Sequence, residues 1–186
     1  MKTFRVVIEG TKPLLMNNGN QIGASTGPKK QGQGYGTPEE QAAKTCYWNE
    51  DRSSLCIPAD NIHAAMKGAA GQYKVGKKSV KPFVAGSVEI VPDFVPFGTK
   101  TFKLDSRRAV VQRQGVLRVR AKLDAGWRLP FNILVEDDFP DRDPGNVLKQ
   151  ILEEAGRRVG LGDFRPEKNG KFGKFAVTQF AEAKVR

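Results

Sequence analysis

The segment from Gly156 to Phe175 concentrates residue types that bind phosphate. It holds five glycines and six basic residues within twenty positions. Glycine lets a backbone approach a phosphate closely and can turn successive N–H groups toward an anion. Arginine and lysine neutralise phosphate charge, and Phe164, Phe172 and Phe175 can stack on bases. The segment therefore predicts contact with a nucleic-acid strand; the alternative interpretation is a glycine-rich turn between a helix and a strand.

Two nucleotide-binding motifs can be tested against this segment, and both fail. The dinucleotide pattern G-x-G-x-x-G fails because Arg165 follows Gly160 and Gly162 where the third glycine belongs. The P-loop pattern G-x-x-x-x-G-K-[ST] fails because Phe172 follows Lys171. Nucleotide hydrolysis is therefore not expected.

Metal chemistry has few candidate ligands in this sequence. His63 is the single histidine, which excludes sites that need two imidazoles and leaves a Ser-His-Asp triad only His63 itself. Cys46 and Cys56 are the only thiols, too few for a disulfide framework or a four-cysteine zinc site, and we expect them reduced and partly buried.

One group of carboxylates could bind Mg²⁺. Its members stand directly before a predicted helix, where negative charge is favourable and an aspartate can cap the first turn. We interpret the group as structural and predict no metal site and no cofactor. It consists of Glu136, Asp137, Asp138, Asp141 and Asp143.

The charge of the chain is large and unevenly distributed. Lys and Arg number 31 against 20 Asp and Glu, a formal net charge of +11, which attracts polyanions. Basic residues prevail at 67–135 and 157–186, whereas residues 136–156 carry seven acids and two bases. No apolar run approaches the about 20 residues of a membrane span, and Glu9 interrupts any secretory leader. We expect a cytoplasmic protein with no membrane partner.

Hydrophobic periodicity predicts the elements that position these residues. A helix should begin near Pro58 and Asp60, with an apolar stripe at Ile62, Ala65, Met66, Ala69, Ala70 and Tyr73. A second helix should follow Asp143, which caps it, with Pro144 in its first turn. The predicted strands are Thr3–Glu9, Val84–Val91, Val116–Leu123, Trp127–Val135 and Phe172–Phe180.

Two of these strands are predicted to form a β-hairpin. A turn at residues 124–126 separates Val116–Leu123 from Trp127–Val135, and Arg118, Arg120 and Lys122 share one face of the first strand. The resulting order is β-α-β-β-α-β, an α+β fold of the ferredoxin-like (RRM-like) type in a single domain over residues 1–186. Two insertions, at about 11–56 and 97–115, and a C-terminal glycine-rich loop are added to this core. The first insertion holds six glycines between Asn17 and Gly36 and is predicted to be a functional loop or a tolerated insertion.

Two segments resemble the RAMP superfamily of CRISPR-associated proteins, which are built on ferredoxin-like folds. Gly160–Gly173 resembles, in position and texture, the glycine-rich loop between the last helix and last strand of these proteins. Leu55–Ala70 is similar to the Ile-Pro-Gly-Ser-Ser-hydrophobic-Lys-Gly stretch that opens the first helix of RAMP backbone subunits. Ala59 replaces the glycine that follows proline in the family, and His63 or Ala64 replaces its lysine.

The resemblance implies an RNA-binding backbone subunit, or a solitary relative, in an antiviral ribonucleoprotein. Such subunits polymerise along guide RNA, so the implied partners are single-stranded RNA (or DNA), further copies of the chain or other ribonucleoprotein subunits. The insertions would match those of the family, one of them a thumb that folds over RNA. RNA-cutting subunits of type III complexes use an aspartate in the first insertion; residues 11–50 contain none, which favours holding the strand over cutting it.

The same resemblance leaves an enzymatic alternative. Some RAMP relatives process RNA without metal, using a histidine as general base on a 2′-hydroxyl. His63 would take that role here, with Lys67, one helical turn later, steadying the phosphate. The competing interpretation is that His63 is a polar surface residue. A phage-type single-stranded DNA-binding protein or a structural protein is a further alternative.

We predict a single-stranded nucleic-acid-binding protein, with RNA favoured. The predicted stacking residue is Phe172, and the glycines of the C-terminal loop are predicted to line the interface at Gly160, Gly162, Gly170 and Gly173. The predicted phosphate contacts are Lys67, Arg107, Arg108, Arg113, Arg118, Arg120, Arg157, Arg158, Arg165, Lys171 and Lys174.

Overall fold

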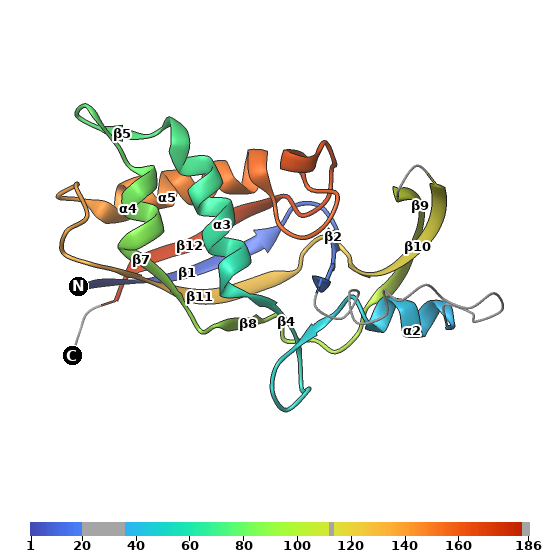
Figure 1. Cartoon of the computed structure of the whole chain (residues 1–186). Coiled ribbons are helices and arrows are strands. Elements are labelled where there is room, and N and C mark those ends of the chain that lie inside the picture. Colours follow the sequence, from blue (N-terminus) through green and yellow to red (C-terminus); the bar gives the residue numbers. More distant parts are fainter. Residues whose placement is uncertain (20–35, 112–113, 184–186) are drawn as a thin grey trace.

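The computed structural model describes residues 1–19, 36–111 and 114–183. In this part of the chain the strands form antiparallel sheets, and helices gather on one face of the largest sheet (Figure 1). The protein is therefore a mixed α/β structure, as the sequence predicts at this level. No helix among the described residues is long and apolar enough to cross a membrane.

The largest sheet has four strands in the order β12–β1–β11–β7, with every neighbouring pair antiparallel. In β1, Phe4, Val6 and Ile8 are buried while Arg5, on the opposite face, is exposed. One face of the sheet thus belongs to the core, as strict alternation requires. The bounds are β1 (Lys2–Gly10), β7 (Val88–Val91), β11 (Arg128–Val135) and β12 (Phe175–Glu182).

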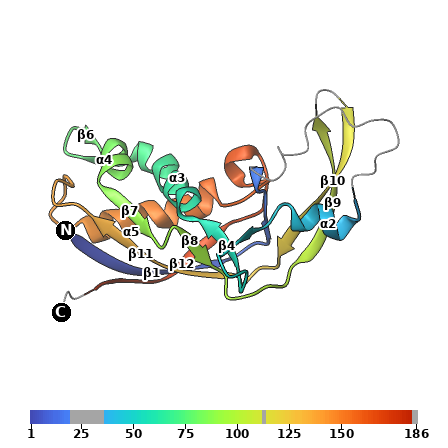
Figure 2. The same cartoon turned by 60° about the horizontal axis from the view of Figure 1, so that its bottom comes forward.

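Helices α3, α4 and α5 cover the buried face of this sheet (Figure 2). The apolar stripe predicted for the first helix is confirmed, since Ile62, Ala65, Met66 and Ala69 of α3 are buried. The cap of α5 is confirmed too, because the Asp143 carboxylate accepts a hydrogen bond from the backbone N–H of Asn146. The bounds are α3 (Ala59–Ala69), followed by the 3₁₀ helix η1 (Ala70–Gln72), α4 (Lys81–Gly86) and α5 (Pro144–Glu154), followed by the π-helix η2 (Ala155–Val159).

A second sheet carries a long hairpin that projects from the body of the molecule beside α2 (Figure 2). Strands β9 and β10 form the hairpin, and β2 pairs with the base of β10. Most of the predicted excursion at 97–115 therefore belongs to a regular hairpin. The bounds are β2 (Leu14–Leu15), α2 (Pro38–Ala43), β9 (Lys103–Val111) and β10 (Gln114–Leu123).

The predicted hairpin between Val116–Leu123 and Trp127–Val135 is wrong. β10 pairs with β9, whereas β11 pairs with β1 and β7 in the other sheet. The chain changes sheets at Gly126 and Trp127, because Gly126 N–H donates to the Gly10 carbonyl and Gly10 N–H donates to the Trp127 carbonyl. These bonds attach the start of β11 to the end of β1.

The remaining strands form two small sheets. β3 (Tyr47–Trp48), β4 (Leu55–Pro58) and β8 (Phe94–Pro96) make one, and β5 (Lys74–Val75) and β6 (Lys78–Ser79) make the other. The first insertion thus contains β2, α2 and β3, where only a loop was predicted; residues 20–35 of the predicted loop lie outside the described residues. The start of the predicted strand at 84–91 is also different, because residues 81–86 form α4.

The two thiols supply a test of this core. Cys46 and Cys56 are free and buried, and burial raises their pKa to about 12 and about 11. Because the thiolate is the reactive form, we expect almost no labelling of the native protein by a thiol reagent near about pH 8 and rapid labelling of both thiols in denaturant. A thiol that reacts quickly in the native protein would contradict the buried positions.

Candidate nucleic-acid interface

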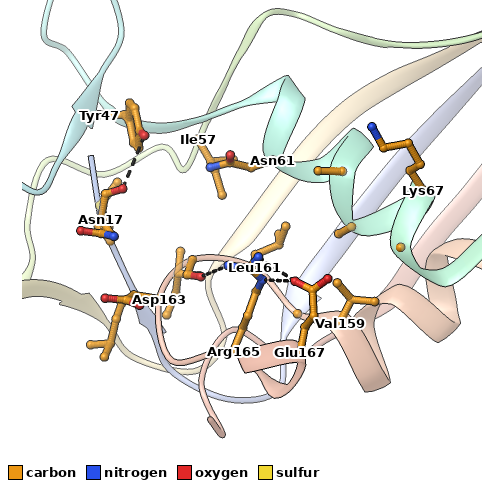
Figure 3. Close-up of a pocket in the computed structure, with 18 of the residues that line it drawn as sticks. Asn17, Tyr47, Ile57, Asn61, Lys67, Val159, Leu161, Asp163, Arg165 and Glu167 are labelled. Carbon is orange, nitrogen blue, oxygen red and sulfur yellow. Dashed lines mark hydrogen bonds and ion pairs between the residues drawn. The ribbon is translucent and has the colours of Figure 1, made fainter. Parts of the chain in front are cut away.

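Two segments that are far apart in the sequence meet at one cavity. One face of α3 supplies Asn61 in its first turn and Lys67 in its last, and the loop that follows η2 supplies Asp163 and Arg165 (Figure 3). Strand β2 closes a third side, and the cavity volume is about 440 Å³. The two segments that resemble RAMP proteins therefore line the same hollow.

Many backbone N–H groups of the glycine-rich loop are hydrogen-bonded to carbonyl groups of the protein itself. Gly173 N–H donates to the Pro13 carbonyl at 2.8 Å, and Asp163 N–H donates to the Leu15 carbonyl at 2.9 Å. Inside the loop, which includes the 3₁₀ helix η3 (Pro166–Lys168), Gly170 N–H donates to the Arg165 carbonyl at 2.9 Å. The first two bonds hold the loop against β2 and the segment before it, and none of the three N–H groups is free to form the anion nest that the sequence suggests.

The glycines of this loop have a packing role. A Cβ on Gly162 would lie 2.4 Å from the Leu15 carbonyl oxygen, and one on Gly173 would lie 1.8 Å from the Leu161 carbonyl oxygen. Gly160, Gly162 and Gly173 also have positive φ, between 67° and 75°, where side chains are strained. The predicted phosphate-facing role of these glycines is therefore replaced by close contact with the protein's own backbone.

Gly170 offers a clean test of this packing. A Cβ there would lie 1.7 Å from the Phe164 carbonyl oxygen, so we expect Gly170→Ala to lower the free energy of unfolding by at least about 2 kcal/mol. Gly71→Ala is the matched control, because no atom lies within 4 Å of its Cβ position. Urea denaturation of both variants measures the difference; equal stability of the two would contradict the close packing.

Arg157 and Arg158 share one carboxylate. Glu154 is 5% exposed, and its oxygens lie 2.8 Å from Arg157 Nη2 and 2.6 Å from Arg158 Nε. A hydrogen bond from Gln72, followed by the charges of the two arginines, lowers the pKa of Glu154. Both guanidinium groups remain exposed, so they are fixed in place and yet accessible to solvent.

Phe172 is covered by Arg107. The ring is 6% exposed, and the Arg107 Cζ lies 4.4 Å from its centroid, while Arg107 Nε pairs with Asp105. A cation over an aromatic face is favourable, and it occupies that face. The ring that was predicted to stack on a base is thus covered by the protein's own arginine in this structure.

Arg120 is buried, which contradicts its predicted contact with phosphate. Its side chain is 5% exposed, and its Nε lies 2.7 Å from an Asp163 carboxylate oxygen. Its guanidinium carbon also lies 5.1 Å from the Phe164 ring centroid. The ion pair joins β10 to the glycine-rich loop, because the face of the hairpin that carries Arg120 turns toward the loop instead of solvent.

Removing Asp163 would leave the Arg120 charge buried without a partner. We expect Asp163→Ala to lower the free energy of unfolding by about 3 kcal/mol, and Arg120→Met in the same chain to restore part of this loss. The exposed pair Glu9–Arg128 is the control, and Glu9→Ala should cost under about 0.5 kcal/mol. Urea denaturation distinguishes these results; a double variant no more stable than Asp163→Ala would contradict the electrostatic explanation.

Several predicted phosphate ligands have no ion-pair partner among residues 1–19, 36–111 and 114–183. Lys67, Arg108 and Lys171 are exposed, whereas Arg118 and Lys174 are partly buried. Arg165 lies at the cavity but is paired with Glu167 at 2.7 Å. Arg113 lies outside the described residues.

His63 points away from the cavity. Its ring Nε2 lies 2.7 Å from the Val84 carbonyl oxygen of α4, so this nitrogen must carry the proton and donate it. Lys67 lines the cavity, and His63 does not. The structure therefore does not bring these two residues to one site.

The predicted carboxylate group has structural contacts. Asp141 accepts a hydrogen bond from the Asp143 backbone N–H, Asp143 caps α5, and Asp137 pairs with the N-terminal ammonium of Met1. Among the described residues, no group of three or more histidine, cysteine, aspartate or glutamate side chains is placed to hold a metal ion.

Most of the residues that line the cavity were not singled out in the sequence, and Asn61, Lys81 and Tyr47 are examples. Asn61 and Lys81 line the hollow from α3 and α4, and Tyr47 reaches it from β3. Tyr47 lies with its hydroxyl 3.5 Å from the Asn17 carbonyl oxygen (Figure 3). The basic run at 74–81 was a visible signal for Lys81; nothing in the local pattern singles out Tyr47.

Solved structures share this fold. No protein-family model matches the chain, and no curated protein matches it in sequence. A chain of the type III-B Cmr-beta complex bound to cognate target RNA matches with a TM-score of 0.62 at 13% identity, over 98% of this chain and 61% of that one. A chain of a type IV-B CRISPR complex matches with a TM-score of 0.55 at 9% identity, over 99% and 92%. The resemblance to CRISPR-associated proteins is thus confirmed at the level of the fold.

Proposed function

We propose that this chain is a single-stranded nucleic-acid-binding subunit of a CRISPR-type ribonucleoprotein, with RNA as the bound strand. The observation that carries the proposal is the convergence of one face of α3 and the glycine-rich loop on one cavity with basic residues at its rim. The fold likeness to a chain from a complex bound to target RNA supports it. Because this chain spans 61% of that one, the activity of the larger chain is part of the proposal only.

The topology supports a ferredoxin-like core within one domain. The core elements follow in the order β1, α3, β7, β11, α5 and β12, and β12–β1–β11–β7 is their order across the sheet. Numbered within that core, the strands lie in the order 4-1-3-2 and are all antiparallel. The helices cover one face, so the loop between α5 and β12 lies at an end of the sheet.

The charges divide into two groups with different roles. Lys67, Arg108 and Lys171 are exposed and unpaired among the described residues, so they would bind phosphates at little cost in broken contacts. Arg157 and Arg158 are held by Glu154, which reduces the side-chain entropy lost when a phosphate binds. Neutralised phosphates release counterions, and this release makes binding dependent on salt.

Holding the strand is favoured over cutting it. The Nε2 proton of His63 is donated to the Val84 carbonyl, so this nitrogen is not poised as a base at the cavity. Asp51, which follows the aspartate-free stretch 11–50, accepts a hydrogen bond from the Ser53 backbone N–H in the turn between β3 and β4. We therefore propose binding, with further copies or other subunits as neighbours along the strand.

The proposal predicts salt-dependent binding of a single strand. Labelled strands of about 30 nucleotides, as RNA and as DNA, would be titrated with protein and followed by fluorescence anisotropy at several salt concentrations. We expect tighter binding of RNA, with a log–log salt slope of about −0.7 per neutralised phosphate. The double variant Lys67→Glu, Lys171→Glu should bind roughly tenfold more weakly and flatten the slope by about 1.4.

A matched variant separates local contacts from overall charge. Lys2→Glu with Lys149→Glu changes the net charge equally at two exposed positions, on β1 and α5, that do not line the cavity. It should lose much less affinity. Equal loss in both double variants would indicate nonspecific attraction to a basic protein, and preference for DNA would favour the alternative of a single-stranded DNA-binding protein.

A further inference from the structure

The cavity continues into two shallower hollows along the surface. The first has a volume of about 590 Å³ and shares Tyr47 and Asn61 with the cavity. The second has a volume of about 720 Å³ and shares Trp48 and Arg52 with the first. The three hollows are therefore neighbours on the surface, and residues of β3 border all three.

Aromatic side chains line the middle hollow. Phe94 of β8 is 48% exposed, and Tyr47 and Trp48 of β3 are partly buried. In the part of the chain that the structure describes, these three rings are in no ring–ring or cation–π contact, unlike Phe172 under Arg107. Tyr47 and Trp48 pack in part against the hydrophobic core, whereas Phe94 exposes apolar surface to water, so covering that surface with a ligand is favourable.

The charges around the aromatic hollow suit an anionic strand that continues from the cavity. Three exposed basic residues line the two shallower hollows: Arg52 lines both, and Lys44 and Lys100 line the second. Two acids are also present, but Glu40 accepts a hydrogen bond from the Thr37 backbone N–H in the capping box of α2. The other, Asp60, lies in the first turn of α3, where the helix dipole favours a negative charge.

We propose that Tyr47, Trp48 and Phe94 form a base-stacking site for the strand whose phosphates bind at the cavity. The proposal rests on the proposed function and adds to it the place where a base is held. Every nucleobase has a π-face, so stacking on these rings is tolerant of sequence, and Arg52 and Lys100 hold the adjoining phosphates. The hollow adjoins the cavity at Tyr47 and Asn61, so one strand could occupy both, and this adjacency is the reason for choosing the same strand as the occupant.

Tryptophan fluorescence reports directly on this site. The chain has two tryptophans, and Trp127 is 7% exposed beneath Gly10, while Trp48 lines the hollow. A base stacked on Trp48 should quench its emission during titration with an unlabelled RNA strand of about 30 nucleotides. Trp48→Phe should abolish the quenching and keep the affinity, because phenylalanine retains a π-face.

Affinity measured by anisotropy supplies the second measurement. Trp48→Ala and Phe94→Ala should each weaken binding by about 5- to 150-fold, the range for loss of one stacked base. A strand of abasic sugar phosphates of equal length should bind wild-type protein and Trp48→Ala alike. Circular dichroism checks that each variant is folded. If Trp48→Ala does not fold, the affinity of Phe94→Ala and the quenching of the wild-type protein test the stacking site instead.

The outcomes separate this proposal from the one on which it rests. Quenching, together with losses in the alanine variants that vanish on the abasic strand, supports the stacking site. Binding that weakens in the Lys67→Glu, Lys171→Glu variant but shows no quenching and no loss with Trp48→Ala overturns the stacking site and leaves the proposed function standing. Absence of binding by the wild-type protein overturns both.

Discussion

A buried ion pair between Arg120 and Asp163 holds together the parts of the molecule that surround the cavity. Arg120 comes from the projecting hairpin, and Asp163 comes from the glycine-rich loop, whose backbone is hydrogen-bonded to Leu15 of β2. A guanidinium that is 5% exposed needs a counter-charge, so hairpin, loop and β2 can occupy only relative positions that keep the two groups in contact. The hydrophobic core is shared with the central sheet and its helices, since the same cluster of buried residues includes Leu14 of β2 and Val119 and Leu123 of β10.

Local patterns were enough to predict most elements of the central core, although the end of α4 was predicted to be the start of a strand. The stripe from Ile62 to Ala69 and the cap at Asp143 depend on residues close together in the chain, and the structure has both. Local patterns could not predict which strand pairs with β10. Its alternation is the same whichever strand lies beside it, and the turn at Gly126 resembles a hairpin turn until Gly10 is known to lie next to it. Pairing was decided by contacts between distant residues.

For the candidate site, the sequence predicted the segments that line the cavity but not the positions of individual side chains, because those positions also depend on residues far apart in the chain. The glycine-rich loop could be found because its composition is unusual, and α3 could be found from its apolar stripe and its resemblance to RAMP proteins. Arg120 was assigned to solvent because an arginine in an alternating strand is usually exposed, and only Asp163 explains its burial. Gly162 and Gly173 were predicted to contact phosphate, but glycine is needed there because the Leu15 and Leu161 backbones leave no room for a side chain. Tyr47 and Trp48 stand in a segment of the chain without periodicity, and only the fold brings them beside α3.

The glycine-rich loop separates the residues that fix its shape from those that carry its charge. Backbone bonds to Pro13 and Leu15 and glycines without room for a side chain maintain its course, and the exposed lysine at 171 takes part in no ion pair among the described residues. Substitutions at such exposed positions can therefore change the charge of this surface while the loop keeps its conformation. The same scaffold can thus carry different surface charges, altered one residue at a time.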